Sequence, residues 1–247
     1  MMKDKNYYET QASQEEYLDW YKSTKQEENY QRPSVGINIA LFAYDGKRKD
    51  IVFLIVKRKR NPYKDIFGLP GTFIRKNEDV LTETVPNEVK LETGIDDLKY
   101  IKQLSFYTSS NRDPRGWVLS LTYLVGVDFN KVKFDTTNAN GYEVKWVTIN
   151  EVPQLAFDHN KVIRTATEKL NSLVQTDKLT YSILGRTFAL KTALDFYNSA
   201  LNDNNVKSLT TSNFMKIYGV NHQWFKETKK CKIVGRGRPT KIVKLIV

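Results

Sequence analysis

The sequence has one cysteine, two histidines and no apolar run long enough to cross a bilayer. Cys231 has no second cysteine with which to form an internal disulfide or a metal cluster, which fits a reducing compartment. The longest apolar runs, such as Ile51–Val56, have the length of a strand, whereas a membrane-spanning helix needs about 20 residues. The first residues also lack the apolar stretch of a signal peptide. We therefore expect a soluble, cytoplasmic protein without membrane association.

Acidic residues are scarce toward the carboxyl terminus. The chain has 39 basic and 28 acidic residues, a net charge of +11. Residues 206–247 contain ten Lys or Arg and one acid, Glu227, whereas residues 1–32 contain five basic and seven acidic residues. A basic terminal segment on a nearly balanced body predicts an acidic partner.

Hydrophobic residues make up 40% of the chain and aromatic residues 12%, which is enough to fill hydrophobic cores. Ser13 is placed to cap a helix with Glu16 three positions on, so residues 1–32 are predicted to form a helical extension. Residues 33–175 then predict a mixed α+β domain. Its expected strands cover residues 35–46, 50–60, 102–110, 117–129 and 142–149, and its expected helices cover residues 78–93 and 160–174.

The pattern changes from about residue 176 onward. Residues 188–201 predict a helix, and residues 210–219 a short helix that Gly219 ends. Another helix is expected to start at Asn221, followed by strand, Gly-rich turn and strand to residue 247. This order is typical of a winged helix-turn-helix, which we place at residues 176–247.

The stretch Leu69–Ile95, LPGTFIRKNEDVLTETVPNEVKLETGI, resembles the Nudix box, whose pattern is G-x5-E-x7-R-E-U-x-E-E-x-G-U with U aliphatic. Glu88 and Glu92 match the first and last glutamates of its core, and Val89 and Ile95 match aliphatic positions. The flanking segments IVKRKRNPYKDIFGLPGTF and VPQLAFDHNKVI are also similar to those of Nudix domains. The resemblance covers residues 33–175 and implies the Nudix α/β/α sandwich with a mixed sheet.

The segment that resembles the Nudix box lacks two of the residues on which the family's metal chemistry depends. Glutamates four residues apart share one helix face, so Glu88 and Glu92 together could hold Mg²⁺. Leu91, however, replaces the middle glutamate of the family pattern, and Asn87 replaces its arginine. Pro86 is also expected to kink the helix at a cost of about 3 kcal/mol. We therefore predict a domain that has lost hydrolysis; alternatively, the two glutamates belong to a solvated helix face.

A Nudix-like domain followed by a winged helix resembles the NrtR-type Nudix-related transcriptional regulators. Residues 111–125, NRDPRGWVLSLTYLV, look like a segment of the same regulators. The resemblance implies that the degenerate Nudix domain senses a nucleotide sugar such as ADP-ribose and that the winged helix binds operator DNA. It also implies a homodimer, because a palindromic operator needs two DNA-reading helices.

A pyrophosphate ligand needs cations on a scaffold, and Arg58, Arg112 and Arg115 lie at a strand end or in a loop beside strands. Phe73 or Tyr107 could stack on adenine. The alternative is a type I turn with surface arginines at RDPRG and aromatic rings in the core. His159 is expected to be a structural histidine rather than a metal ligand.

The basic segment supplies candidates for DNA contacts. Asn and Gln can pair with adenine, lysines can contact phosphates, and arginines around a turn suit a narrow minor groove. The alternative is a basic helix on a solvated face. The candidates are Asn221, His222, Gln223, Lys226, Lys229, Lys230, Arg236, Arg238 and Lys241.

Two other functions stay open. One is a Mg²⁺-dependent Nudix hydrolase of ADP-ribose or a related nucleoside diphosphate derivative, with Glu78 or Asp79 as a third carboxylate. The other keeps DNA binding but replaces the ligand by a sugar or sugar phosphate. AMP release would support the enzyme, whereas salt-dependent binding of duplex DNA would support either regulator.

Overall fold

The computed structural model describes residues 4–24, 32–132, 137, 140–201, 208–233 and 239–246. The chain divides into two units, Met1–Ser34 and Val35–Val247. The domain boundary predicted between residues 175 and 176 lies inside the second unit and stays a prediction. No helix in the described ranges is both long and apolar enough to cross a membrane.

The first unit is a pair of short helices, α1 (Lys5–Thr10) and α2 (Gln14–Ser23). The predicted cap is confirmed, since the Ser13 hydroxyl accepts a hydrogen bond from the Glu16 amide at 3.1 Å. The ring of Tyr8 stacks on Trp20 with centroids 4.8 Å apart and planes at 5°. The aromatic side of α2 therefore packs on α1.

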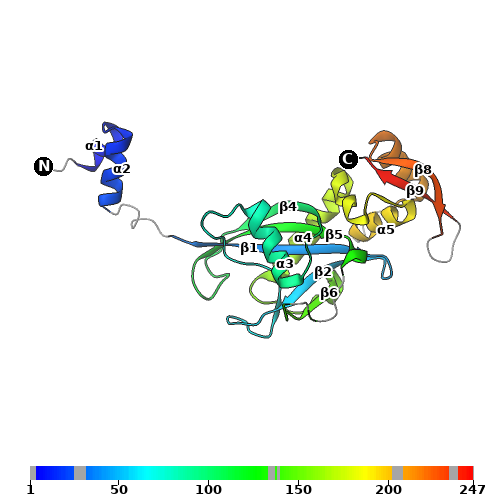
Figure 1. Cartoon of the computed structure of the whole chain (residues 1–247), viewed down its shortest axis with the longest axis horizontal. Coiled ribbons are helices and arrows are strands. Elements are labelled where there is room, and N and C mark those ends of the chain that lie inside the picture. The colour runs from blue at the N-terminus through cyan, green and yellow to red at the C-terminus, as the bar shows by residue number, and fades with distance from the viewer. Residues whose placement is uncertain are drawn as a thin grey trace. The chain divides into compact units, whose positions relative to one another are not determined.

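The second unit is built around a mixed sheet, as predicted (Figure 1). Its described strands run in the order β3-β2-β1-β5-β4, and β6 pairs with β2. The strands are β1 (Ser34–Asp45), β2 (Asp50–Lys57), β3 (Phe67–Gly68), β4 (Leu98–Tyr107), β5 (Val118–Val127) and β6 (Val144–Thr148). Short 3-10 turns follow at Phe129–Lys131 (η3) and Ile149–Glu151 (η4).

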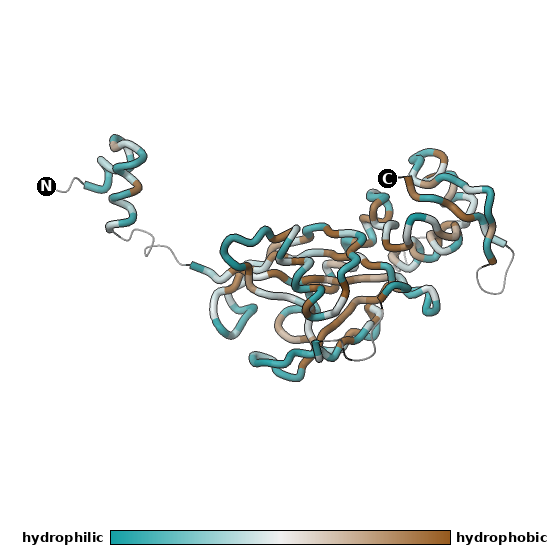
Figure 2. The backbone as a smooth tube through the Cα atoms, viewed as in Figure 1, coloured by the Kyte–Doolittle hydropathy of each residue, from teal (hydrophilic) through white to brown (hydrophobic). Residues whose placement is uncertain are grey.

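Successive residues of β1 enter different cores, because side chains alternate across a strand. Leu41 packs in a cluster with Val89 of α3 (Val85–Thr93), while Phe42 packs in a cluster with Ile163 of α4 (His159–Thr176). The sheet is thus covered by a helix on each face, which confirms the predicted sandwich. Brown, hydrophobic segments follow the central strands in Figure 2.

The segment predicted as one kinked helix consists of two helical types. A π-helical turn, η2 (Val80–Thr84), runs directly into α3, and Pro86 lies in the first turn of α3. Proline is tolerated in a first turn because its fixed φ suits the helix. The expectation of one regular helix over residues 78–93 is therefore wrong, whereas the kink at Pro86 stays a prediction. Gly94 ends α3 in the left-handed region with φ 75°, as predicted.

The carboxyl-terminal module contains helices and a three-stranded antiparallel sheet of order β7-β9-β8. This combination is consistent with the predicted winged helix. The elements are η5 (Lys178–Leu184), β7 (Thr187–Ala189), α5 (Leu190–Ala200), α6 (Thr211–Phe214), η6 (Met215–Asn221), β8 (Phe225–Lys232) and β9 (Thr240–Leu245).

Two predictions for this module are wrong. Gly219 does not end a helix, because α6 and η6 continue to Asn221. No helix starts at Asn221 either, because Gln223 adopts a left-handed conformation with φ 55° and Phe225 begins β8. The helix directly before β8 therefore covers residues 211–221, which includes the segment predicted as the preceding short helix.

Candidate functional site

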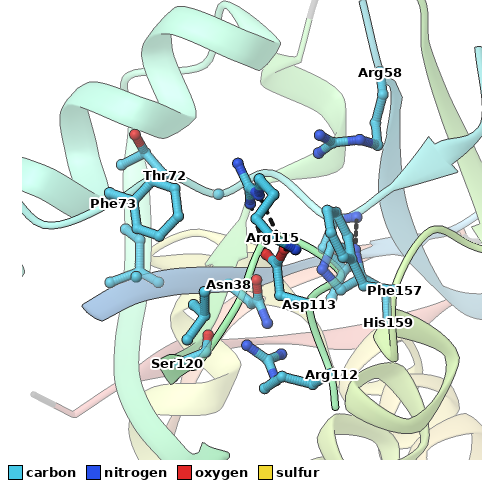
Figure 3. Close-up of a pocket in the computed structure, with 15 residues that line it drawn as sticks. Asn38, Arg58, Thr72, Phe73, Arg112, Asp113, Arg115, Ser120, Phe157 and His159 are labelled. Carbon is cyan, nitrogen blue, oxygen red and sulfur yellow. Dashed lines mark hydrogen bonds and ion pairs between the residues drawn. The ribbon is translucent and has the colours of Figure 1, made fainter. Parts of the chain in front are cut away.

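A polar cavity of about 200 Å³ opens beside the start of β1 and the Leu69–Phe73 loop (Figure 3). The structure brings all four predicted ligand residues to it, from three separate segments. Its lining also includes residues that the sequence analysis did not select. The main polar and aromatic lining residues are Asn38, Arg58, Phe73, Arg112, Asp113, Arg115, Ser120, Phe157 and His159.

Arg58, just past the end of β2, is a half-buried cation of this cavity. Its Nε donates to the carbonyl of Pro62 at 2.8 Å. Among the ion pairs of the described residues, none joins Arg58 to a carboxylate. Burial and the nearby positive charge of Arg115 lower the pKa of Arg58. An anion placed here would relieve the repulsion between the two cations.

Arg115 faces the same space from the loop before β5. Its guanidinium donates to both carboxylate oxygens of Asp113, at 2.9 and 2.7 Å, and lies 4.9 Å from the ring centre of Phe73. The hydrogen bond to Asp113 raises the pKa of Arg115. The Arg115 side chain is still 46% exposed, so it has room to contact a ligand.

Arg112 has a different environment, because its side chain is only 6% exposed. It makes a two-pronged contact with Asp158, at 3.1 and 2.7 Å. With its amide oxygen turned toward Arg112, Asn38 accepts from Nη2 at 3.0 Å and from the Ser120 hydroxyl at 3.1 Å. The guanidinium is thus already paired, and its main contribution is to hold the loop against the residue that precedes α4.

His159 and Phe157 form the wall next to α4. His159 is 4% exposed, and its Nδ1 accepts from the Leu69 amide at 2.9 Å. Burial lowers the pKa of His159 to about 3, which keeps the ring neutral and agrees with the predicted structural role. Phe157 was not predicted as a site residue. It lies in the LAFDHN segment, residues 155–160, whose resemblance to Nudix domains does not single out this aromatic residue.

Glu88 and Glu92 lie on one face of α3, as their spacing predicts, and Glu88 is 7% exposed. Burial, and then the charge of Glu88, raise the pKa of Glu92 to about 8. The Gly71 amide donates to Oε2 of Glu92 at 3.2 Å. This contact connects α3 to the loop that carries Phe73, so Glu92 supports the wall of the cavity.

The residues do not fit the three-glutamate metal cluster of a Nudix hydrolase. In the described part of the chain, no three His, Cys, Asp or Glu side chains gather in a metal-binding group. Asp79, one suggested third carboxylate, instead accepts from the amide of Thr82 at 2.8 Å at the start of η2. Glu78, the other, accepts from the Thr84 hydroxyl at 3.3 Å. Mg²⁺ on Glu88 and Glu92 alone stays a prediction.

The predicted DNA-contacting residues are spread over three environments. Asn221 and His222 lie at the end of η6 and in the turn, while Lys226, Lys229 and Lys230 are exposed on β8 rather than on a helix. Lys241 on β9 is paired with both carboxylate oxygens of Glu227 at 2.8 Å. Arg236 and Arg238 lie outside the described residues.

Comparison with known proteins places these features in a family. The NUDIX domain model matches residues 32–167. The chain is 39% identical to an ADP-ribose pyrophosphatase of Methanocaldococcus jannaschii over 117 residues, which are 47% of this chain and 66% of that enzyme. It is 27% identical to the ADPR responsive transcriptional repressor NtrR of Acinetobacter baylyi over 234 residues, 94% of this chain and 88% of the repressor.

Two solved structures are similar as well. Shewanella oneidensis NrtR complexed with a 27mer DNA has a TM-score of 0.74 and 24% identity, covering 86% of this chain and 93% of that one. The NUDIX domain of the same protein complexed with ADP ribose has a TM-score of 0.54 and 28% identity, covering 64% and 99%. The first likeness shows a shared fold over both the sheet domain and the carboxyl-terminal module. With more than half of its length matched by the domain model, the chain belongs to the Nudix family.

Proposed function

We propose that this protein is a DNA-binding transcriptional regulator whose Nudix domain senses a nucleotide sugar such as ADP-ribose. The observation that carries the proposal is a cavity with two facing arginines beside a Nudix helix that lacks the catalytic carboxylate cluster. Similarity to a repressor over 94% of the chain supports the same combination of domains. A sensor benefits from lost catalysis, because it does not consume its signal.

The cavity suits the diphosphate of such a ligand. Arg58 and Arg115 supply two positive charges, and guanidinium groups bind phosphate oxygens with two parallel hydrogen bonds. Phe73 and Phe157 offer aromatic faces next to these charges.

The carboxyl-terminal module suits DNA. The helix over residues 211–221 buries Phe214 and Tyr218 and exposes Asn213, Lys216 and Asn221. Lysines on β8 lie on the edge strand of the following sheet, where they can contact phosphates. We assign DNA reading to this helix and backbone contacts to the sheet. A homodimer would present two such helices to a palindromic operator, and we propose that the protein acts in the cytoplasm.

The test combines three measurements on the full-length protein. ADP-ribose is titrated with Mg²⁺ while heat of binding and AMP release are followed in one sample, and duplex DNA binding is then measured with and without saturating ADP-ribose. Saturable binding without AMP, together with a ligand-dependent change in DNA affinity, is the expected result. DNA affinity that is identical with and without ligand would contradict the proposal. Sedimentation of the free and DNA-bound protein tests the dimer.

The second candidate function is a Mg²⁺-dependent hydrolase of ADP-ribose or a related nucleoside diphosphate derivative. The observation that favours it is 39% identity to an ADP-ribose pyrophosphatase within the domain. Under this alternative AMP is released with Mg²⁺, and Glu92→Gln abolishes the release while Glu168→Gln, an exposed control on α4, does not. Release of AMP at the same rate from the Glu92→Gln protein would count against Glu92 as a catalytic carboxylate.

A further inference from the structure

Phe157 holds an unusual backbone conformation beside the ligand cavity. Its φ is 55°, in the left-handed region that bulky side chains rarely adopt. Such strain persists only where the surrounding structure enforces it, and strained residues gather at ligand sites. Phe157 also lines the cavity rather than belonging to either buried core.

The chain is fixed on both sides of this residue. The Ala156 amide donates to the carbonyl of Phe67 at 2.8 Å, and the carboxylate of Asp158 receives the two hydrogen bonds from Arg112. Anchors on both neighbours force the intervening residue into its conformation. The fold therefore sets the direction of the Phe157 side chain, which lines the cavity in Figure 3.

The ring itself is held by other rings. Tyr63 meets it edge to face with centroids 4.8 Å apart, and His159 lies 5.3 Å away at 43°. Aromatic rings in such contacts keep a defined orientation. The faces of Phe157 are thus available in a fixed position.

Two guanidinium groups converge on that ring. The guanidinium carbon of Arg58 lies 4.7 Å from the ring centre and that of Arg115 lies 5.8 Å from it. Both distances fall within the range over which a cation is attracted by an aromatic face. The two arginines come from different segments and repel each other, and the charge of Arg115 contributes to the lowered pKa of Arg58. A shared aromatic contact offsets this repulsion.

We infer that Phe157 is the positioning residue of the cavity: its ring holds the guanidinium groups of Arg58 and Arg115 side by side, which makes a site for two adjacent phosphates. Phe73, on Arg115 alone, orients one of the cations. A ligand with a single phosphate engages one cation at a time and gains less from the arrangement. The inference rests on the proposed ligand class and identifies the residue that would select for a diphosphate.

Two substitutions of Phe157 distinguish the effect of its aromatic ring from the effect of side-chain size. Phe157→Leu keeps an apolar side chain but removes the ring, whereas Phe157→Tyr keeps the ring. Both retain a β-carbon at the same strained position, so backbone strain is common to them. Calorimetric titration of the full-length proteins with ADP-ribose, inorganic pyrophosphate and AMP supplies the affinities, and thermal unfolding of each free protein monitors folding.

We expect Phe157→Leu to weaken binding of ADP-ribose and pyrophosphate by about tenfold and binding of AMP by less than about threefold. Phe157→Tyr is expected to bind all three ligands within about threefold of the parent. Unchanged diphosphate binding by the Leu protein would overturn the inference. So would an equal loss for all three ligands, which is the sign of a merely structural role.

The same titrations distinguish this inference from the proposed function. A parent protein that binds pyrophosphate but not ADP-ribose would contradict the proposed ligand, and the Leu and Tyr proteins would still test Phe157 with pyrophosphate. A parent protein that binds neither would overturn both, because the two-phosphate site would not exist.

Discussion

At the scale of single residues, the ionisation of Glu92 makes the stability of the folded protein depend on pH. Its pKa is about 8 in the folded protein, against an ordinary value of 4.5, because of burial and then the charge of Glu88. A raised carboxyl pKa favours the folded state fully below pH 4.5, and this contribution is lost as pH rises through 8.

Glu92→Gln removes that ionisation and leaves an oxygen that can accept from the Gly71 amide. We expect the variant to be more stable than the parent at pH 9 by on the order of 2 kcal/mol and to match it near pH 4.5. Urea unfolding at both pH values in EDTA measures the difference. Equal stability of the two proteins at pH 9 would contradict the assignment, and Glu168→Gln serves as the exposed control.

Gly71 is required for close contact between the loop and β1. A β-carbon at this position would lie 2.4 Å from the backbone oxygen of Ile37. Gly71→Ala is therefore expected to shift the loop that carries Phe73, to cost about 1–3 kcal/mol of stability and to weaken ligand binding. Gly46→Ala is the control, because a β-carbon there meets nothing within 4 Å. Thermal unfolding and titration measure both effects, and parent-like values for Gly71→Ala would refute the close contact.

At the scale of elements, the Arg112–Asp158 pair joins the ligand loop to the amino end of α4. At its far end α4 leads into η5, and α4 also packs on α5 of the carboxyl-terminal module. Asp158→Asn leaves the buried guanidinium without its counter-charge, and we expect a loss of about 2–4 kcal/mol of stability. We also expect ADP-ribose to lose its effect on DNA affinity while still binding.

The apolar double variant Arg112→Met with Asp158→Leu is the matched comparison, since it removes both charges at once. It should recover most of the stability in urea unfolding but not the ligand effect on DNA. A ligand effect of parental size in Asp158→Asn would show that α4 does not carry the coupling.

The helix predicted to start at Asn221 is the element that sequence reasoning got wrong. WFKETKK has a composition that fits a basic helix, yet Phe225 pairs with Leu245 in a sheet that forms only when residues 240–245 return. Local sequence does not report such a distant partner. The turn at Gln223 is held by the same returning segment, because the Ile246 amide donates to the Trp224 carbonyl at 2.9 Å.

The corrected position gives a direct prediction. Lys216→Ala, on the exposed face of the helix over residues 211–221, is expected to weaken duplex DNA binding by about tenfold and to lower the salt slope by about one. Lys226→Ala on β8 should have a smaller effect, and Lys169→Ala on α4 should have none. Salt-dependent fluorescence anisotropy ranks the three proteins, and a larger loss from Lys226 than from Lys216 would restore the strand as the main contact.

At the scale of the whole molecule, the proposed effect of ADP-ribose on DNA binding must be reciprocal. If ADP-ribose changes DNA affinity by a given factor, DNA must change ADP-ribose affinity by the same factor, and about 5- to 150-fold is usual. Titrating ADP-ribose into free protein and into the protein–DNA complex measures this factor. Factors that differ beyond error would mean that a third equilibrium, such as dimerisation, is involved.

The sequence by itself determined the sheet domain, the place of the box and the uneven charge, because these depend on local periodicity and on spacing along one helix. It also selected Arg58, Phe73, Arg112 and Arg115, which the structure brings to one cavity. Only the tertiary structure decided that Arg112 is buried in an ion pair and that Phe157 faces two cations. It also showed that the helix directly before β8 covers residues 211–221. Each of these depends on contacts between segments far apart in the chain, which no local pattern encodes.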